Sequence, residues 1–229
     1  MSKEQRIYGV TASYPRMLAK DSLKRVTYFS LLAGISGLGS LILLLRGDRF
    51  DRPLAVMGFM AGFAAVTQIL EAKIKISRAM SGIKAEQVVS YKLEKFTKSY
   101  IINGAILKIK TGDADHVVIG PVCAVVETKN GYGEVKGIGN GKITMNGNLV
   151  PRTPLVQARK QAQYLSKLVG VHATPILCLT NITTPPTKIE GVIVTSVKDL
   201  PSVINKLPHL IEEDKALEIV SLINRFNIE

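Results

Sequence analysis

Two long uncharged runs constrain this chain more than any other feature. Val26–Leu45 and Pro53–Leu70 contain no charged residue, and an apolar run of about 18 to 20 residues can cross a bilayer as a helix. The short link between them, RGDRFDR, leaves room only for a tight turn. A buried hairpin in a soluble protein is the alternative, which the lack of a polar face on either run disfavours. We therefore predict a transmembrane helical hairpin over residues 26–72, with spans at 26–45 and 53–70.

The charges that flank the two runs predict their orientation. Two passes leave both termini on one side of the membrane, and the cytoplasmic side carries the excess of lysine and arginine. Cations precede the first span, follow the second and occur in the turn: Lys3, Arg6, Arg16, Lys20, Lys24 and Arg25; Lys73, Lys75, Arg78 and Lys84; Arg46, Arg49 and Arg52. We expect both termini to be cytoplasmic. The basic segment 1–25 is too charged for a signal peptide, and we expect it to be loose or a short surface helix.

Residues 73–229 are predicted to form a cytoplasmic domain of the α/β class. Strand-like apolar runs alternate there with stretches of helical periodicity. Strands are expected at 100–103, 105–110, 174–180 and 191–196, and helices at 85–96, 155–169, 197–206 and 211–226. Gly82 is a candidate break between the second span and the first of these helices. This alternation predicts a mixed central sheet flanked by helices.

The stretch Gly112–Asn130, GDADHVVIGPVCAVVETKN, contains acids placed for chemistry. It is typical of two short strands joined by a turn at Gly120-Pro121. Side chains alternate across a strand, so Glu127 and Lys129 project to one face, and antiparallel pairing brings Asp115 close to them. Acids and a lysine among β-branched residues are costly to bury unless they are paired or bound to a cation. A divalent-metal phosphodiesterase needs this arrangement.

The same residues resemble a known family. GDADHVVIGP followed by VVETKN is similar to the core of the nuclease-related domain, NERD, of the PD-(D/E)XK nuclease superfamily. The resemblance implies a restriction-endonuclease-like fold, with Asp115 as the motif aspartate and Glu127 and Lys129 as the E-x-K pair. We expect Asp115 and Glu127 to ligate Mg²⁺ or Mn²⁺, helped by the Thr128 carbonyl. Lys129 would then orient or activate the attacking water.

Two further site residues are implied by the resemblance. Glu86 stands where the family carries a glutamate at the start of a helix, and it is a candidate third acid. A solvated glutamate favoured by the helix dipole is the alternative. Gln157, in PLVQARKQAQYL, corresponds to the family's motif glutamine and would hold a phosphate or a water. The alternative is an ordinary amphipathic helix on which Gln157 and Gln161 share a polar face.

Several polar neighbours have competing interpretations. Asp113 competes with Asp115 as the ligand, but strand parity and the resemblance both favour Asp115, and an aspartate after Gly112 is typical of a turn. His116 faces the other way, and we expect a structural hydrogen bond, with proton transfer as the lesser alternative. Phosphate contacts from the helix at 155–169 are expected from Arg159, Lys160 and Lys167.

The remaining motifs point away from other kinds of site. Residues 130–148 are rich in glycine but do not lie between a strand and a helix, so a dinucleotide fingerprint is disfavoured. Asn140-Gly141 and Asn146-Gly147 are hairpin-turn dipeptides, and we expect extra β-ribbons there. Cys123 and Cys178 lie in apolar runs and are expected to be buried free thiols.

Together these features predict a membrane-anchored, metal-dependent nuclease. The net charge of +12 suits nucleic acid or an anionic membrane face. The alternative is a catalytically inactive scaffold that binds nucleic acid or a protein partner at the membrane. A transporter component is disfavoured, because neither span carries the charge that an ion path usually requires.

Overall fold

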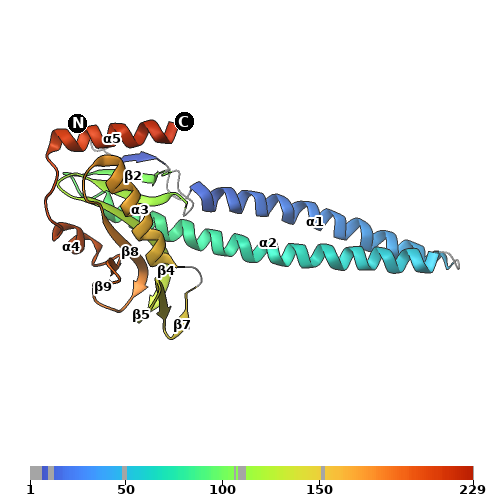
Figure 1. The fold of residues 1–229 in the computed structure, drawn as a ribbon. Helices are drawn as coiled ribbons and strands as arrows, with labels where there is room; N and C mark the ends of the chain where they lie inside the picture. The colour runs from blue at the N-terminus through green and yellow to red at the C-terminus, as the bar shows by residue number, and fades with distance from the viewer. Residues whose placement is uncertain are drawn as a thin grey trace. The chain divides into compact units, whose positions relative to one another are not determined.

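The computed structural model describes residues 7–9, 13–47, 51–105, 107, 112–150 and 153–228. They divide into two compact units (Figure 1). One unit is a helical hairpin of residues 14–81, and the other combines residues 82–229 with the N-terminal strand.

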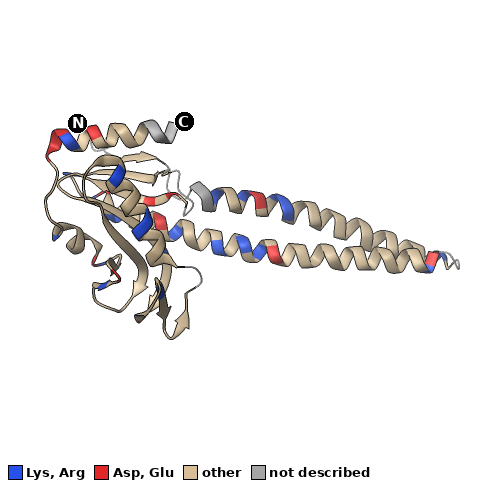
Figure 2. Cartoon of the chain, viewed as in Figure 1, with Lys and Arg blue, Asp and Glu red and all other residues tan. Residues whose placement is uncertain are grey.

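The hairpin consists of the helices α1, Ser13–Arg46, and α2, Asp51–Leu93. By length and composition both are candidate membrane-spanning helices. Their middle parts carry no charge (Figure 2), and most of their large apolar side chains are exposed. Small residues meet where the helices touch: a side chain at Gly58 would overlap the Ser40 hydroxyl, and one at Gly62 would lie 3.5 Å from that of Ser36. A helical hairpin is therefore present where one was expected, and both helices extend beyond the predicted spans.

Two expectations for the flanks of the hairpin are wrong. Ile7–Gly9 forms a strand, β1, and α1 already begins at Ser13, so the described part of segment 1–25 is neither loose nor a short surface helix. The strand forms because β1 finds a parallel partner in Ile101–Asn103. Gly82 does not break α2, which continues to Leu93 because Val89 and Leu93 are buried in the core of the α/β unit.

The α/β unit is built on a seven-stranded mixed sheet, as predicted. Its strand order is β1-β2-β3-β4-β8-β10-β9, and the strands after β1 are Tyr100–Ala105 (β2), Ala114–Ile119 (β3), Cys123–Gly133 (β4), Thr174–Ile182 (β8), Thr187–Ile189 (β9) and Val192–Ser196 (β10). The pairs β1/β2, β4/β8 and β8/β10 are parallel and the others antiparallel. Most of the strand expected at 105–110 lies outside the described residues. The short strand β9 lies in a stretch for which no strand was expected.

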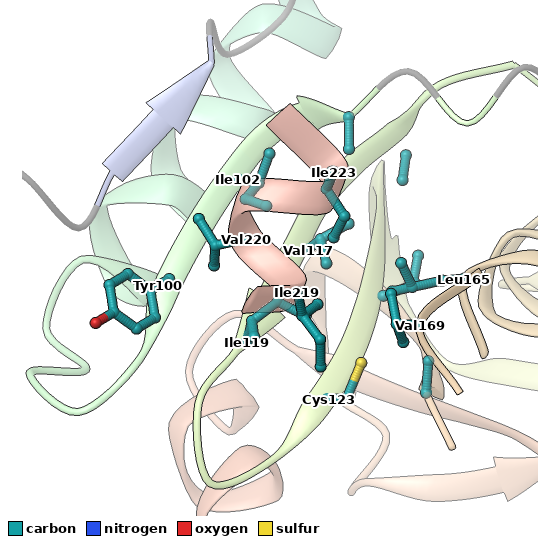
Figure 3. Packing of buried hydrophobic residues seen from close by; sticks show 14 of the residues in the cluster. Tyr100, Ile102, Val117, Ile119, Cys123, Leu165, Val169, Ile219, Val220 and Ile223 are labelled. Carbon is teal, nitrogen blue, oxygen red and sulfur yellow. The ribbon is translucent and has the colours of Figure 1, made fainter. Parts of the chain in front are cut away.

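Helices cover both faces of this sheet. On one face, α3 (Pro154–Val169) and α5 (Glu213–Ile228) pack on β2, β3 and β4 through one apolar cluster. Figure 3 shows Ile219, Val220 and Ile223 of α5 within this cluster. On the other face lie the end of α2 and the short helix α4, Leu200–Asn205. Strands buried on both faces explain why β4 and β8 read as continuous apolar runs.

The glycine-rich segment forms the expected ribbon. Three short strands, Val135–Gly139 (β5), Lys142–Met145 (β6) and Asn148–Leu149 (β7), make a second antiparallel sheet. Both asparagine-glycine turns have positive φ at their two residues, as a type I′ hairpin turn requires.

Candidate nuclease site

The β3–β4 hairpin brings the predicted acids to one face of the sheet. The strands pair antiparallel from Ile119 with Cys123 to His116 with Val126, and the turn closes with a 3.0 Å bond from the Gly120 N–H to the Val122 carbonyl. Continuing this register by one residue puts Asp115 opposite Glu127. Residues directly opposite each other share a face, and the two carboxylates are close enough for the charge of Glu127 to raise the pKa of Asp115.

Glu127 and Lys129 form an ion pair in this position. The Lys129 ammonium donates to Glu127 Oε1, and the Glu127 side chain is completely buried, while 34% of the Lys129 side chain is exposed. The alternation of side chains along β4 therefore puts both groups on one face, as predicted, and the structure adds that the carboxylate lies inside the site and the amine at its rim.

Asp115 is held against β4 by the main chain. Its Oδ2 accepts a hydrogen bond from the Thr128 N–H at 2.7 Å. Burial, and then the neighbouring charge of Glu127, raise the pKa of Asp115 to about 8, although Lys129 and the Thr128 N–H act in the opposite direction. The acid therefore gives up its proton reluctantly unless positive charge is added.

The pKa values of both members of the ion pair, Glu127 and Lys129, are shifted by the same surroundings. Burial raises the pKa of Glu127, and Lys129 only partly offsets this. Burial alone would lower the pKa of Lys129, but Glu127 and Asp115 outweigh it and the pKa lies above its ordinary value. The site thus holds more negative than positive charge when all three groups are ionised.

Glu86 lies near this cluster. It is buried within α2, and its charge contributes to raising the pKa of both Glu127 and Lys129. The alternative of a solvated glutamate at a helix start is wrong, because α2 runs through this position without a break. Its role as a third acid stays a prediction.

The glutamine nearest to Glu127 is Gln161 rather than Gln157. Gln161 is completely buried, donates from Nε2 to the Asp113 carbonyl at 2.9 Å, and lies close enough to Glu127 to lower its pKa. Gln157 lies one turn earlier on α3 and is half-buried; its function stays a prediction. The sequence signal for Gln161 was its spacing of four residues from Gln157, which puts both amides on one side of a helix.

Asp113 and His116, which the sequence left as alternative site residues, take structural roles. Asp113 is exposed and uses its carbonyl, not its carboxylate, in the bond from Gln161. His116 is completely buried, with Nδ1 2.7 Å from Asn103 Oδ1, and burial lowers its pKa to about 3. A histidine that stays neutral and bonded in this way confirms the expected structural hydrogen bond.

The cations expected on α3 differ in their availability. Arg159 pairs with Glu190 at 3.1 Å, whereas Lys160 and Lys167 are exposed. Phosphate contacts by the two lysines stay a prediction.

The oxygen donors suit a hard cation such as Mg²⁺. Among the described residues, no group of three or more His, Cys, Asp or Glu is placed to hold a metal. The carboxylates that share this face are those of Asp115 and Glu127, and the Thr128 carbonyl stays a predicted third ligand. Glu127 Oε2 is buried, with no hydrogen-bond partner among the residues that the structure describes. Such an oxygen is costly to bury alone, and a divalent cation would satisfy it.

Comparison with known proteins agrees with this geometry. Residues 81–196 match the model of the nuclease-related domain, NERD. No curated protein and no solved structure matches the chain significantly. The match spans about half of the chain and includes β2, β3, β4, α3 and β8, which build the site. The chain therefore belongs to the nuclease-related domain (NERD) family.

Proposed function

We propose that this protein is a membrane-anchored nuclease that hydrolyses phosphodiester bonds with the help of Mg²⁺ or Mn²⁺. The supporting observation is the convergence of Asp115, Glu127 and Lys129 on one face of the β3–β4 hairpin, with Glu127 Oε2 buried and without a partner among the described residues. Two acids that repel each other make the site attract a divalent cation.

Each residue has a distinct task in this proposal. Asp115 and Glu127 hold the cation, together with the Thr128 carbonyl, and a bound Mg²⁺ supplies Lewis-acid stabilisation of charge on the phosphate. Lys129, partly exposed at the rim, orients the attacking water or stabilises negative charge on the phosphate oxygens. Gln161 holds the segment before β3 in place through the Asp113 carbonyl. Glu86 and Gln157 act at the edge of the site.

The helical hairpin anchors the nuclease to the membrane in this proposal. The cations at the open end of the hairpin outnumber those at its turn, which favours a cytoplasmic α/β domain and cytoplasmic termini. The orientation is tested by fusing to the C-terminus a fluorescent protein that folds only in the cytoplasm. Loss of its fluorescence in otherwise intact fusions would contradict it.

The function is tested with full-length protein in nanodiscs. End-labelled single- and double-stranded DNA and RNA are incubated with the wild type and with an Asp115→Asn/Glu127→Gln double variant, in Mg²⁺ or in EDTA. We expect cleavage only by the wild type and only with the metal. Equal cleavage by both proteins refutes the assignment. Salt-dependent binding of nucleic acid without cleavage by the wild type favours the inactive scaffold.

A further inference from the structure

The open end of the helical hairpin carries cations on ordered helix. α1 begins at Ser13, before the uncharged run that starts at Val26, and α2 continues past the second run, which ends at Leu70. Every lysine and arginine on these two extensions within the hairpin (Figure 2) is exposed: Arg16, Lys20, Lys24, Arg25, Lys73, Lys75 and Arg78. Because these side chains project from helices, their heights relative to the two uncharged runs are fixed.

Packing of the two helices brings cations of α1 and α2 to the same height. A Cβ at Gly58 would overlap the Ser40 hydroxyl, and the next close approach lies four residues further along each helix, in opposite directions. Because both helices rise by the same amount per residue, this register extends to the open end and puts Arg25 level with Lys73. Lys24 lies one residue further out. The cations of the two helices therefore lie in one layer.

This layer coincides with the headgroup region of a bilayer. At about 1.5 Å per residue, the ends of the uncharged runs lie within about 9 Å of five cations: Lys20, Lys24, Arg25, Lys73 and Lys75. We call these five residues the basic collar. The headgroup region on each side of the hydrocarbon core is about 5–8 Å thick. Lysine and arginine side chains reach into it while their stems lie along apolar surface.

Exposed apolar side chains lie at the same height as the collar. Leu23 of α1 and Ile74 of α2 are exposed, and the exposed Tyr28 lies where the first uncharged run begins. Apolar side chains next to cations match the boundary between acyl chains and headgroups, where tyrosine is enriched. This mixture fits a lipid better than it fits a nucleic-acid backbone, which offers phosphates without an apolar layer.

The positive charge of the collar is not neutralised within the part of the hairpin that the structure describes. Two acids, Asp21 and Glu71, lie among the cations, but no ion pair between described residues joins either acid to the collar. The cations outnumber the acids. A phosphatidylcholine headgroup carries an ammonium as well as a phosphate and does not offset this excess, whereas a lipid of net negative charge does.

We propose that the basic collar binds the phosphate groups of anionic phospholipids, so that the protein prefers membranes that contain them. The inference rests on the proposed membrane anchoring and adds the chemistry of the lipid around the anchor. Orientation of a hairpin needs only an excess of cations on one side. A headgroup contact needs more: cations of both helices in one layer, next to exposed apolar side chains, and this is what the hairpin provides.

Competition between two lipids tests the collar. Full-length protein in a non-ionic detergent is mixed with equal amounts of phosphatidylglycerol and phosphatidylcholine, and native mass spectrometry counts the bound molecules of each lipid. The collar variant is Lys20→Gln/Lys24→Gln/Lys73→Gln/Lys75→Gln, and a second variant carries arginine at the same four positions. The matched control removes as many charges from exposed lysines of the α/β unit: Lys98→Gln/Lys142→Gln/Lys198→Gln/Lys206→Gln.

We expect the wild type and the control to bind phosphatidylglycerol in preference to phosphatidylcholine. One cation near an anionic surface contributes about fivefold in affinity, so the collar variant should bind phosphatidylglycerol at least about tenfold more weakly and phosphatidylcholine unchanged. The arginine variant should bind like the wild type, and added salt should weaken the binding of phosphatidylglycerol. Equal binding of phosphatidylglycerol by the wild type and the collar variant overturns the inference, as does an equal loss in the control.

Extraction of membranes with alkaline carbonate separates this inference from the proposed anchoring. If the protein remains in the washed membranes but shows no preference for phosphatidylglycerol, only the role of the collar is refuted. If carbonate releases the protein but the collar variant still loses phosphatidylglycerol, only the anchoring is refuted. If carbonate releases the protein and the wild type shows no preference, both are refuted.

Discussion

Replacing Asp115 by asparagine tests whether the acids of the site are destabilised by their surroundings. The change removes one negative charge, keeps the shape of the side chain, and leaves an oxygen that accepts the hydrogen bond from the Thr128 N–H. Because the pKa of Asp115 is raised by burial and by Glu127, we expect the metal-free variant to be more stable than the metal-free wild type.

The size of this gain in stability and its dependence on pH follow from the pKa of Asp115. The carboxyl loses its proton near pH 3.8 when unfolded and near pH 8 when folded. Between these values the unfolded chain binds fewer protons, so the wild type loses stability as the pH rises, while asparagine does not titrate. At about 1.4 kcal/mol per pKa unit, the upper limit at neutral pH is about 4 kcal/mol. Asp115 has partial access to solvent, which screens its charge, and we expect roughly 2 kcal/mol.

Two buried thiols provide the assay. The chain has no tryptophan, but Cys123 and Cys178 are free and buried, and burial raises the pKa of both thiols. A dipyridyl disulfide reagent, which reacts in acid as well as at neutral pH, therefore reports unfolding of the sheet during heating. A gain of roughly 2 kcal/mol raises Tm by about 4–8 °C for a domain of this size.

The control and the effect of metal complete the test. Asp113→Asn changes an exposed acid two residues away and should leave Tm nearly unchanged. Adding Mg²⁺ should raise the Tm of the wild type near pH 8 and not that of the Asp115→Asn variant. A gain of the same size near pH 4 and near pH 8 would refute the electrostatic reasoning, as would a lower Tm of the variant near pH 8.

Two more comparisons use matched pairs. Gln161→Met removes the buried donor to the Asp113 carbonyl and should lower stability by about 1–3 kcal/mol and lower kcat, whereas Gln157→Met should leave stability unchanged. Cleavage rates and thiol-detected melting of both variants decide which amide serves the site. Equal stabilities of the two variants would contradict this assignment. Gly58→Val forces a side chain onto Ser40 in the helical hairpin and should cost about 1–3 kcal/mol, whereas Gly34→Val meets nothing within 4 Å. Circular dichroism during titration with SDS should show the loss of helix earlier for Gly58→Val alone.

Regular local patterns made part of this structure predictable. Two uncharged runs separated by a short link predict the helical hairpin, because length and hydropathy are properties of a single segment. The parity of Glu127 and Lys129 follows from the alternation of side chains along a strand, and the Gly120-Pro121 turn aligns Asp115 with them. The asparagine-glycine turns of the ribbon are equally local, since their positive φ depends on the residues at the turn alone.

Other features depend on partners distant in the sequence. Gln161 rather than Gln157 lies nearest to Glu127, because packing of α3 on the sheet fixes the rotation of the helix. Ile7–Gly9 becomes a strand only because β2 offers it an edge, and Glu86 is buried only because α2 continues past Gly82.

The sequence by itself determined the apolar hairpin, the strand that carries Glu127 and Lys129, and the charge surplus of the chain. Only the tertiary structure decided where β4 departs from regular pairing, since its register with β8 shifts between Lys129 and Tyr132 and the Gly131 N–H bonds to the Thr180 hydroxyl. Alternation within a strand is a local rule, whereas a bulge is defined by the neighbouring strand. The direction of a side chain beyond a bulge is therefore a property of the sheet and cannot be read from one segment.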